Sequence, residues 1–507
     1  MRYSRAKPAA QGFLQDLVNC PSMSKPRYLV LGVLLGLAAA LGLGASGQPP
    51  VVCKTAGVAV LMAVWWITEA VSICFTGLLP LILFPLLGIL PGTAIAPMYM
   101  KEVIFLFIGG FILAYAVERW GLHRRIALWI ILHMGASPAR LLAGFMLAGW
   151  FLSMWILNTA AATLLLPAAL AVLDELRERS NGNDFGLTTP LLLGVAFSTS
   201  IGGTATLIGT MPNLVLKDFY AQNFPALPGL TFAQWFAFGL PLSAFMLLVC
   251  WLLLKHFWLR EKGVVLDVHA VRERYLNLGP VQYEEKVMAF AFGLTILAWF
   301  TMAEIPFGSF VFPGWVPALG LEAYIQESTI AMAVVGLLFL WPARSTKSNI
   351  IGWAEVERIP IGVIFLFGGG FALAAGLDSS GLSNWIAGQL SGLEGQPLLL
   401  IVVGLCLFTT FFTELTSNTA TTILMLSLLL PMTKSLEIHP LAIMLPVTIT
   451  ASYAFMLPVA TPPNTIVFAS GQLAVRDMVR VGIWLNLIGT MAVVAASHFI
   501  GSRIFGF

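Results

Sequence analysis

The sequence consists mainly of long apolar blocks separated by short polar segments, and this pattern limits the possible folds more than any other feature. The first block runs from Tyr28 to Ala45, and others follow at intervals to about residue 500. A helix of about 20 apolar residues spans the hydrocarbon core of a bilayer. Charged residues make up only 10% of the chain, against about 25% in soluble proteins, which excludes a soluble enzyme and a disordered protein. We therefore expect an all-α polytopic membrane protein.

The first residues, 1–27, are polar and basic, and we expect them to form a cytoplasmic tail. The apolar run that follows is longer than the core of about 7–15 residues found in a signal peptide, so it is interpreted as a first spanning helix. Small residues after the run, Gly44 to Gly47, leave a cleaved signal as the alternative. The net charge of +3 does not suggest nucleic acid. Scattered cysteines and histidines predict neither a disulfide framework nor a metal cluster.

Two apolar blocks are interrupted by polar residues. Block 141–173 contains Leu157-Asn158-Thr159, and block 397–431 contains Thr416-Ser417-Asn418-Thr419. The pieces on either side run ~12–17 residues, which is short for a crossing. Each block is better interpreted as a re-entrant helical hairpin that turns near mid-membrane, at about 138–178 and about 395–433.

The distribution of basic residues supports two hairpins. With the N-terminus inside and both blocks folded as hairpins, loops 304–327 and 377–396, which lack Lys and Arg, lie outside. The basic residues left outside are Lys54, Lys101, Lys217, Lys434 and Arg503. This bias follows the positive-inside rule. We expect about eleven spanning helices plus two hairpins, with the C-terminus outside.

An internal repeat divides the chain. Val103–Phe111 reappears in similar form as Val363–Phe371, and Gly121-Leu122, Asn158-Thr159 and Thr210–Asn213 recur in the same order as Gly381-Leu382, Asn418-Thr419 and Thr461–Asn464. We place the first half at 28–255, a charged cytoplasmic linker at 256–285 and the second half at 286–507. Because the halves face opposite ways in this topology, the repeat is inverted. Secondary transporters are built in this way, with substrate held near the midplane by broken helices. Two similar bundles without a site between them are the plainer alternative.

Each half has a second polar break, from Gly202 to Asn213 in the first half and from Val459 to Asn464 in the second. A broken membrane helix frees carbonyls that suit Na+ and N–H groups that suit an anion. Segments 141–176, 188–213, 398–433 and 440–464 contain no Lys or Arg. An anion held there without a basic side chain would depend on a bound cation, which is the physical basis of coupled transport.

The individual polar residues allow plainer interpretations. Asn158 and Asn418 could make ordinary hydrogen bonds between helices, although their repeated placement favours a site. Glu414, beside the second tip, could tune a cation site or cap and pair locally. No cluster of His, Asp, Glu or Cys is placed to do chemistry at the midplane, so we do not expect an enzyme.

The sequence resembles the divalent anion/sodium symporter family from about residue 28 onward. Ala451–Asn464 looks like the signature sequence of that family, and Glu414–Thr422 and Ser200–Thr210 are similar to its other motifs. The resemblance implies a homodimer. Each protomer would have a scaffold domain and an elevator-type transport domain, both drawing on the two halves. The transport domain would hold both hairpins and helices broken at 204–212 and 459–463.

The resemblance also implies the site residues. One Na+ site would use Asn158 with carbonyls of Ser153, Leu157 and Gly209; the other would use Asn418 with Thr413, Ser417 and Ala460. The substrate carboxylates would meet Asn158, Thr159, Thr210, Ser417, Asn418, Thr419, Thr461 and Pro462. The family tip is Ser-Asn-Thr, and Leu157 replaces the first serine, which removes one donor to the anion.

The function expected from these residues is Na+-coupled symport of C4-dicarboxylates such as succinate, malate or fumarate. The alternatives are a dicarboxylate exchanger of the same fold without Na+ coupling, a sulfate or citrate carrier, and, with less support, an anion channel. The short N-terminus is typical of a bacterial inner-membrane protein. Beyond small anions, Na+ and lipid, no partner is expected except a second copy of the chain.

Overall fold

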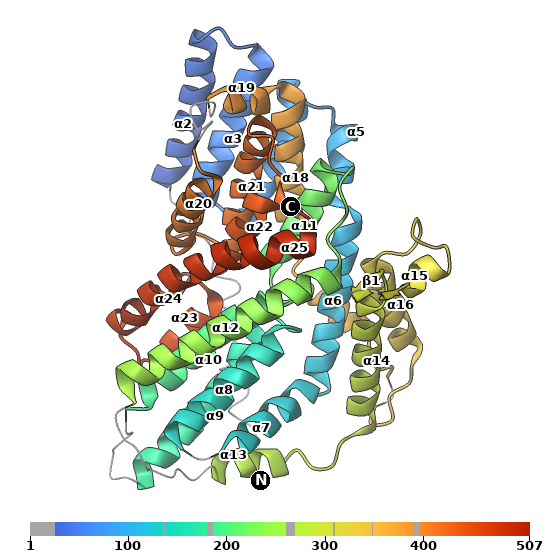
Figure 1. The fold of residues 1–507 in the computed structure, drawn as a ribbon, viewed down its shortest axis with the longest axis vertical. Coiled ribbons are helices and arrows are strands. Elements are labelled where there is room, and N and C mark those ends of the chain that lie inside the picture. Colours follow the sequence, from blue (N-terminus) through green and yellow to red (C-terminus); the bar gives the residue numbers. More distant parts are fainter. Residues whose placement is uncertain are drawn as a thin grey trace.

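The computed structural model describes residues 26–135, 137–179, 186–259, 269–307, 310–346, 348–389 and 396–507. The tail predicted at 1–27 lies almost wholly outside these ranges. The described residues fold as a bundle of helices with one short antiparallel ribbon (Figure 1). Within these described ranges, seven helices are long and apolar enough to cross a membrane, and five apolar helices are shorter. The predicted total of eleven crossings stays a prediction.

The helices of the first half and of the linker follow one another along the chain. They are α2 Pro26–Ala45, α3 Pro50–Thr68, α4 Ile73–Leu87, α5 Gly92–Ile95, the 3-10 helix η1 Ala96–Tyr99, α6 Glu102–Arg119, α7 Leu122–Met134, α8 Pro138–Ser153, α9 Asn158–Arg179, α10 Thr188–Gly203, α11 Met211–Asn223, α12 Phe232–Trp258 and α13 His269–Leu276.

In the second half, helices α18 to α24 repeat the order of α6 to α12, and a short ribbon lies before them. Its elements are α14 Tyr283–Phe300, β1 Ile305–Phe307, β2 Phe310–Phe312, α15 Trp315–Ala318, α16 Glu327–Leu340, α17 Trp353–Glu357, α18 Gly362–Ser380, α19 Leu382–Gln389, α20 Leu398–Thr413, α21 Asn418–Ser435, α22 Leu441–Thr450, α23 Pro462–Phe468, α24 Val475–Ala496, the π-helix η3 Ser497–Gly501 and α25 Ser502–Phe505.

The repeat found in the sequence corresponds to equivalent packing in space. Gly109 of α6 lies against Ala331 of α16, and its equivalent, Gly369 of α18, lies against the backbone of Gly77 in α4. The rings of Phe107 and Phe367, 260 residues apart, contact each other with centroids 5.9 Å apart. Equivalent residues that touch lie near the axis relating two copies. The halves are therefore intertwined across a pseudo-twofold axis, as in transporters with inverted repeats.

A glycine at the same place in each half turns the chain after these helices. Gly121 follows α6 with φ +76°, and Gly381 follows α18 with φ +83°. This left-handed conformation is favourable for glycine, which has no Cβ. The Gly-Leu matches in the sequence therefore mark the turn into α7 and α19, the short helices that lead to each hairpin.

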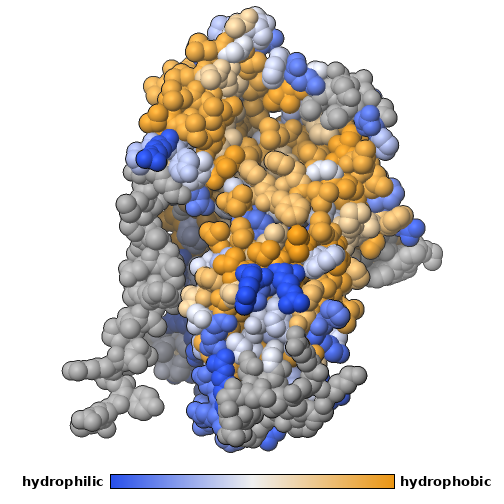
Figure 2. All heavy atoms as spheres, turned by 90° about the vertical axis from the view of Figure 1, so that its left-hand side faces the viewer, coloured by the Kyte–Doolittle hydropathy of each residue, from blue (hydrophilic) through white to orange (hydrophobic). Residues whose placement is uncertain are grey.

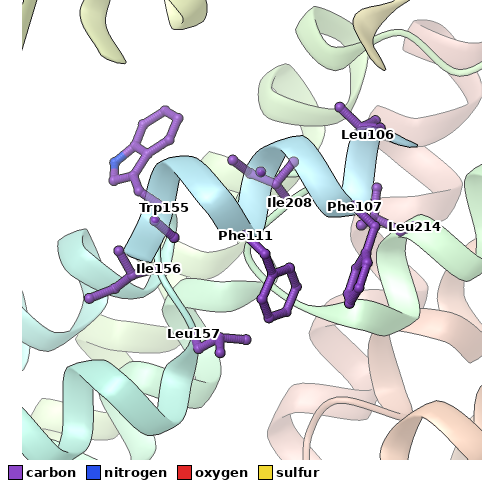
Figure 3. Close-up of a pocket in the computed structure, with 10 residues that line it drawn as sticks. Leu106, Phe107, Phe111, Trp155, Ile156, Leu157, Ile208 and Leu214 are labelled. Carbon is purple, nitrogen blue, oxygen red and sulfur yellow. The ribbon is translucent and has the colours of Figure 1, made fainter. Parts of the chain in front are cut away.

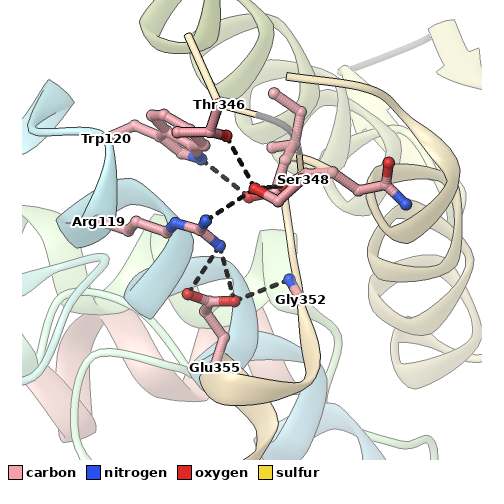
Figure 4. Close-up of polar contacts among 8 residues, drawn as sticks. Arg119, Trp120, Thr346, Ser348, Gly352 and Glu355 are labelled. Atoms are coloured by element: carbon pink, nitrogen blue, oxygen red, sulfur yellow. Dashed lines mark hydrogen bonds and ion pairs between the residues drawn. The ribbon is translucent and has the colours of Figure 1, made fainter. Parts of the chain in front are cut away.

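Polar contacts fix the end of α6 to the second half (Figure 4). Arg119 donates to both carboxylate oxygens of Glu355 at 3.0 Å and to Ser348 Oγ at 3.2 Å. The Trp120 ring nitrogen donates to the Ile350 carbonyl at 2.9 Å. Both bonds to Glu355 come from one guanidinium nitrogen, Nη1, and are charge-assisted. Together with the bonds to Ser348 and Ile350, they join the two halves at this corner.

The surface agrees with a membrane environment. On the face shown in Figure 2, apolar side chains cover the upper and middle parts, and hydrophilic side chains gather toward the lower end. The exposed large hydrophobic residues include Leu34 and Leu41 of α2, Phe290 of α14 and Leu340 of α16. A contiguous apolar surface of this size is not expected of a soluble monomer.

Candidate functional site

The predicted substrate residues gather at the first turns of four helices. Helix α9 begins at Asn158, and Thr210, Ser417 and Thr461 immediately precede α11, α21 and α23. The other predicted contacts, Thr159, Asn418, Thr419 and Pro462, lie in the first turns of α9, α21 and α23. The N–H groups of a first turn have no partner within the helix and carry partial positive charge, so helix starts of this kind can bind an anion without a basic side chain.

The first tip connects α8 and α9 through residues 154–157. Ser153 Oγ donates to Asn158 Oδ1, which fixes the asparagine at the start of α9. A Cβ added at Gly203 would lie 2.7 Å from Asn158 Oδ1 and 3.1 Å from the Gly209 carbonyl oxygen. The structure therefore brings together Ser153, Asn158 and Gly209, three of the four residues predicted for the first Na+ site. Gly203, which keeps the space beside them open, was not predicted.

The second tip repeats this arrangement with a threonine. Thr413 Oγ1 lies 2.8 Å from Asn418 Oδ1 and 2.8 Å from the Ala451 carbonyl oxygen. One hydroxyl proton serves only one of these acceptors at a time. The cluster therefore has more oxygen acceptors than protons, which suits a hard cation such as Na+. Ala451, like Gly203, was not predicted.

Glu414 holds the unwound segment beside the second tip. Its carboxylate accepts the backbone N–H groups of Phe455, Met456 and Leu457 at 2.8, 2.9 and 3.0 Å. It also accepts Asn486 Nδ2 at 2.7 Å, and the side chain is only 3% exposed. Of the two sequence interpretations, these contacts favour local capping, because four donors surround the carboxylate.

The second break is longer than the sequence suggested. Helix α22 ends at Thr450 and α23 begins at Pro462, so residues 451–461 are unwound rather than 459–463 alone. The physical reason is that Glu414 takes the N–H groups that a continuing helix would have used. The first break, at 204–210, lies within the predicted 204–212.

A matched asparagine supports each unwound segment. Asn213 Nδ2 donates to the carbonyls of Gly203 and Thr206 at 3.1 and 2.7 Å. Asn464, its equivalent, donates to the carbonyls of Ala454 and Leu457 at 3.2 and 3.0 Å. Both side chains are fully buried. These bonds satisfy carbonyls that would otherwise be unpaired at membrane depth. The repeated Asn at the end of each motif was the sequence signal for this role.

The two halves of the site interlock crosswise. Helix α9 packs on α23, and its equivalent α21 packs on α11, so each hairpin contacts the restarted helix of the other half. In Figure 1 the two hairpins lie toward opposite ends of the view, with α10, α12, α22 and α24 between them. The hydrogen bonds of each tip described above remain within its own half. Helix packing, not direct bonding, brings the halves together.

The predicted substrate residues differ in exposure. Thr159 and Pro462 are exposed, while Asn158, Thr210, Ser417 and Asn418 are half-buried. Thr419 and Thr461 are buried, and Thr461 Oγ1 accepts the Asn464 N–H at 3.4 Å. Thr461 thus caps its helix, whereas the side chain of Thr210 makes no such cap. Because Thr461 Oγ1 only accepts in this cap, both hydroxyls of this matched pair keep a proton that can be donated to a ligand.

Leu157 lies at an apolar interface, the seam, between the first tip and α6 (Figure 3). It lines, with Phe107, Phe111, Trp155 and Ile208 among others, a cavity of about 20 Å³. A cavity of this size has room for about one water molecule, so it cannot hold a dicarboxylate. The leucine that replaces the family serine therefore supports packing between the tip and α6.

Comparisons with known proteins agree with this architecture. The family described as the sodium:sulfate symporter transmembrane region matches residues 28–505. The chain belongs to this family. The resemblance found in the sequence is thereby confirmed, and the members it matches are transporters, not enzymes.

Curated relatives cover most of the chain. The sodium-dependent dicarboxylate transporter SdcS of Staphylococcus saprophyticus is 39% identical over 88% of this chain and 85% of its own length. SdcS of Staphylococcus aureus strain MRSA252 is 38% identical over 94% of this chain and 91% of its own length. Both are named as sodium-dependent carriers of dicarboxylates.

Solved transporters share the fold. The YdaH transporter of Alcanivorax borkumensis matches with a TM-score of 0.52 and 15% identity over 83% of this chain and 88% of its own. MtrF of Neisseria gonorrhoeae matches with a TM-score of 0.53 and 14% identity over 80% of this chain and 82% of its own. The predicted fold class, a polytopic helical transporter, is confirmed.

Proposed function

We propose that the protein is a Na+-coupled symporter of C4-dicarboxylates such as succinate, malate or fumarate. The observation that carries this proposal is the pair of asparagine tips, each tied by a hydroxyl at Asn158 or Asn418 and each facing an unwound segment. Oxygen-rich tips suit Na+, and helix N-termini suit carboxylates. The printed function of the SdcS relatives agrees with this chemistry.

Two Na+ ions and one dicarboxylate are the proposed ligands, and each has its own set of residues. The first Na+ would bind Asn158 with the carbonyls of Ser153, Leu157 and Gly209, and the second would bind Asn418 with Thr413, Ser417 and Ala460. The dicarboxylate would meet Asn158, Thr159 and Thr210 from one half and Ser417, Asn418, Thr419, Thr461 and Pro462 from the other. Each carboxylate would then face the first turns of helices and a cation, and neither would need a basic side chain.

The proposal extends to assembly and placement. The protein would lie in the cell membrane, with its N-terminus in the cytoplasm and its C-terminus outside, as the distribution of basic residues supports. It would form a homodimer in which a transport domain, holding both hairpins, moves as an elevator against a scaffold. The polar tips would thereby reach each side of the membrane in turn.

The direct test is uptake of labelled succinate into proteoliposomes. With a Na+ gradient we expect accumulation, and with choline in place of Na+ we expect uptake near background. Uptake that ignores Na+ and is stimulated by internal dicarboxylate would instead establish an exchanger. Inhibition of uptake by excess sulfate or citrate, but not by malate or fumarate, would show that the protein carries sulfate or citrate rather than C4-dicarboxylates. Currents far above carrier turnover would establish a channel.

A single substitution locates the site. Asn418→Ala removes the amide oxygen that Thr413 orients, and we expect it to abolish Na+-driven uptake while the protein elutes as the wild type does. Asn223→Ala is the matched control, because in the described part of the chain Asn223 bonds only to the Phe219 carbonyl of its own helix α11. Wild-type uptake by the Asn418 variant would refute this assignment.

A further inference from the structure

A second cavity, outside the transport site, lies where the linker helix meets the first hairpin. It has a volume of about 340 Å³ and is lined by α7, α9 and the end of α13. Figure 1 shows α13 at the lower end of the molecule, below α7. Helix α13 contacts both of these helices, and its Val271 is fully buried. The cavity is therefore formed by a docked helix, and its volume falls within the ~300–1,000 Å³ of ligand pockets.

The walls of this cavity are amphipathic. Arg124 of α7 and Arg274 of α13 line it, and among the described residues no Asp or Glu does. The α9 wall consists of Thr163, Leu164, Leu165, Pro167 and Ala168. A ligand that fits must carry negative charge at one end and an apolar part at the other.

Arg124 and Arg274 differ in their hydrogen bonding from Arg125, the residue next to Arg124. Arg125 donates to both oxygens of Glu285, at 2.5 and 3.0 Å, and also to the Gly279 carbonyl at 3.0 Å. Among the described residues, neither Arg124 nor Arg274 has a hydrogen bond, ion pair or ring contact, and both are exposed. Arg125 fastens the end of the linker helix, while Arg124 and Arg274 keep their donors available at the cavity.

The cavity also lies at a change of polarity. Helix α9 is apolar enough to be a membrane span, whereas α13 carries charged side chains such as Arg272 and Glu273. An apolar helix that meets a charged one is typical of the bilayer interface. Basic pockets between helices at the cytoplasmic interface bind anionic lipid headgroups.

We propose that this cavity binds one anionic phospholipid, with its phosphate between Arg124 and Arg274 and its acyl chain against the leucines of α9. The apolar wall favours a lipid over a free anion, because a phosphate ion alone would leave Leu164 and Leu165 uncovered. The bound lipid would connect α9 of the hairpin to α7 and α13. This site is independent of the proposed transport function, since it shares no residue with the tips.

The test is native mass spectrometry of the full chain with added phosphatidylglycerol, with phosphatidylcholine as the neutral reference. We expect one tightly held phosphatidylglycerol per chain. Affinity should fall about fivefold for Arg124→Gln or Arg274→Gln and about thirtyfold for the double variant. Arg272→Gln is the matched control, because it lies on the same helix, is exposed and does not line the cavity; it should bind as the wild type does.

Other outcomes overturn the proposal. Equal retention of phosphatidylcholine would mean apolar packing without headgroup recognition. Displacement of the lipid by millimolar inorganic phosphate would assign the site to a free anion. Unchanged binding in the double variant, eluting as a single folded species, would place the lipid elsewhere. Succinate uptake in the double variant would show separately whether the transport site is intact.

Discussion

The two tips hold their asparagines alike but support the neighbouring unwound segments differently. Ser153 and Thr413 occupy equivalent positions and bond Asn158 and Asn418 in the same way. Next along the chain, the first half has Met154 where the second has Glu414. The Met154 carbonyl accepts Thr206 Oγ1, a main-chain contact. The Glu414 carboxylate instead takes three N–H groups.

This difference accompanies the difference in length between the two breaks. In the shorter first break the N–H groups of Thr204 and Ala205 still bond to carbonyls of Ile201 and Gly202 in α10. In the longer second break the N–H groups at 455–457 have no helix to bond to, and a carboxylate supplies the acceptors. What the halves share is the arrangement that holds the asparagines. What they do not share is the means by which each satisfies its freed backbone.

Replacing Glu414 should have the largest effect. Glu414→Ala leaves three backbone donors and Asn486 Nδ2 without acceptors in a buried place. A buried donor left without a partner costs about 1–3 kcal/mol, so with four such donors we expect a marked fall in thermal stability and no uptake. Met154→Leu, the equivalent change in the first half, alters only an apolar side chain and should cost less than about 1.5 kcal/mol. Thermal unfolding of both variants in detergent measures this difference. Similar losses of stability in the two variants would contradict the claim that only the second half depends on a carboxylate.

Gly203→Ala should have the next largest effect, because the first half has no room for a Cβ atom beside its asparagine, whereas the second half already carries one at the equivalent position. The added methyl group would lie 2.7 Å from Asn158 Oδ1, and overpacking of this kind costs about 1–3 kcal/mol. We expect the Na+ concentration for half-maximal uptake to rise about tenfold. The equivalent residue is Ala454, which already carries a Cβ, so Ala454→Gly should leave the Na+ dependence unchanged. If Gly203→Ala leaves the Na+ dependence of uptake unchanged, Asn158 does not bind the cation.

Much of this arrangement could be predicted from the sequence, and the remainder has a physical explanation. The Asn-Thr tips and the repeated Asn213 and Asn464 are local signals, since a polar residue inside an apolar block must mark a break or a contact. The extent of the second break was not predictable, because Glu414 lies 41 positions before the first amide that it accepts. Gly203 belongs to the break that the sequence predicts from Gly202 to Asn213, but its role beside Asn158 was not predictable, because that role depends on what lies opposite in space.

The smallest effect concerns the residue immediately before each asparagine, Leu157 in the first tip and Ser417 in the second. Leu157→Ser would restore a hydroxyl at the first tip, and a hydrogen bond contributes about 0.5–1.5 kcal/mol, so dicarboxylate affinity should rise about two- to tenfold. The change also removes a side chain that lines the seam with Phe111, so thermal stability should fall slightly. Leu157→Ala separates the two effects, because it loses the same packing and gains no donor. If Leu157→Ala binds succinate as tightly as Leu157→Ser, the gain comes from the space at the seam and not from the hydroxyl, and the two tips contact the substrate through different groups.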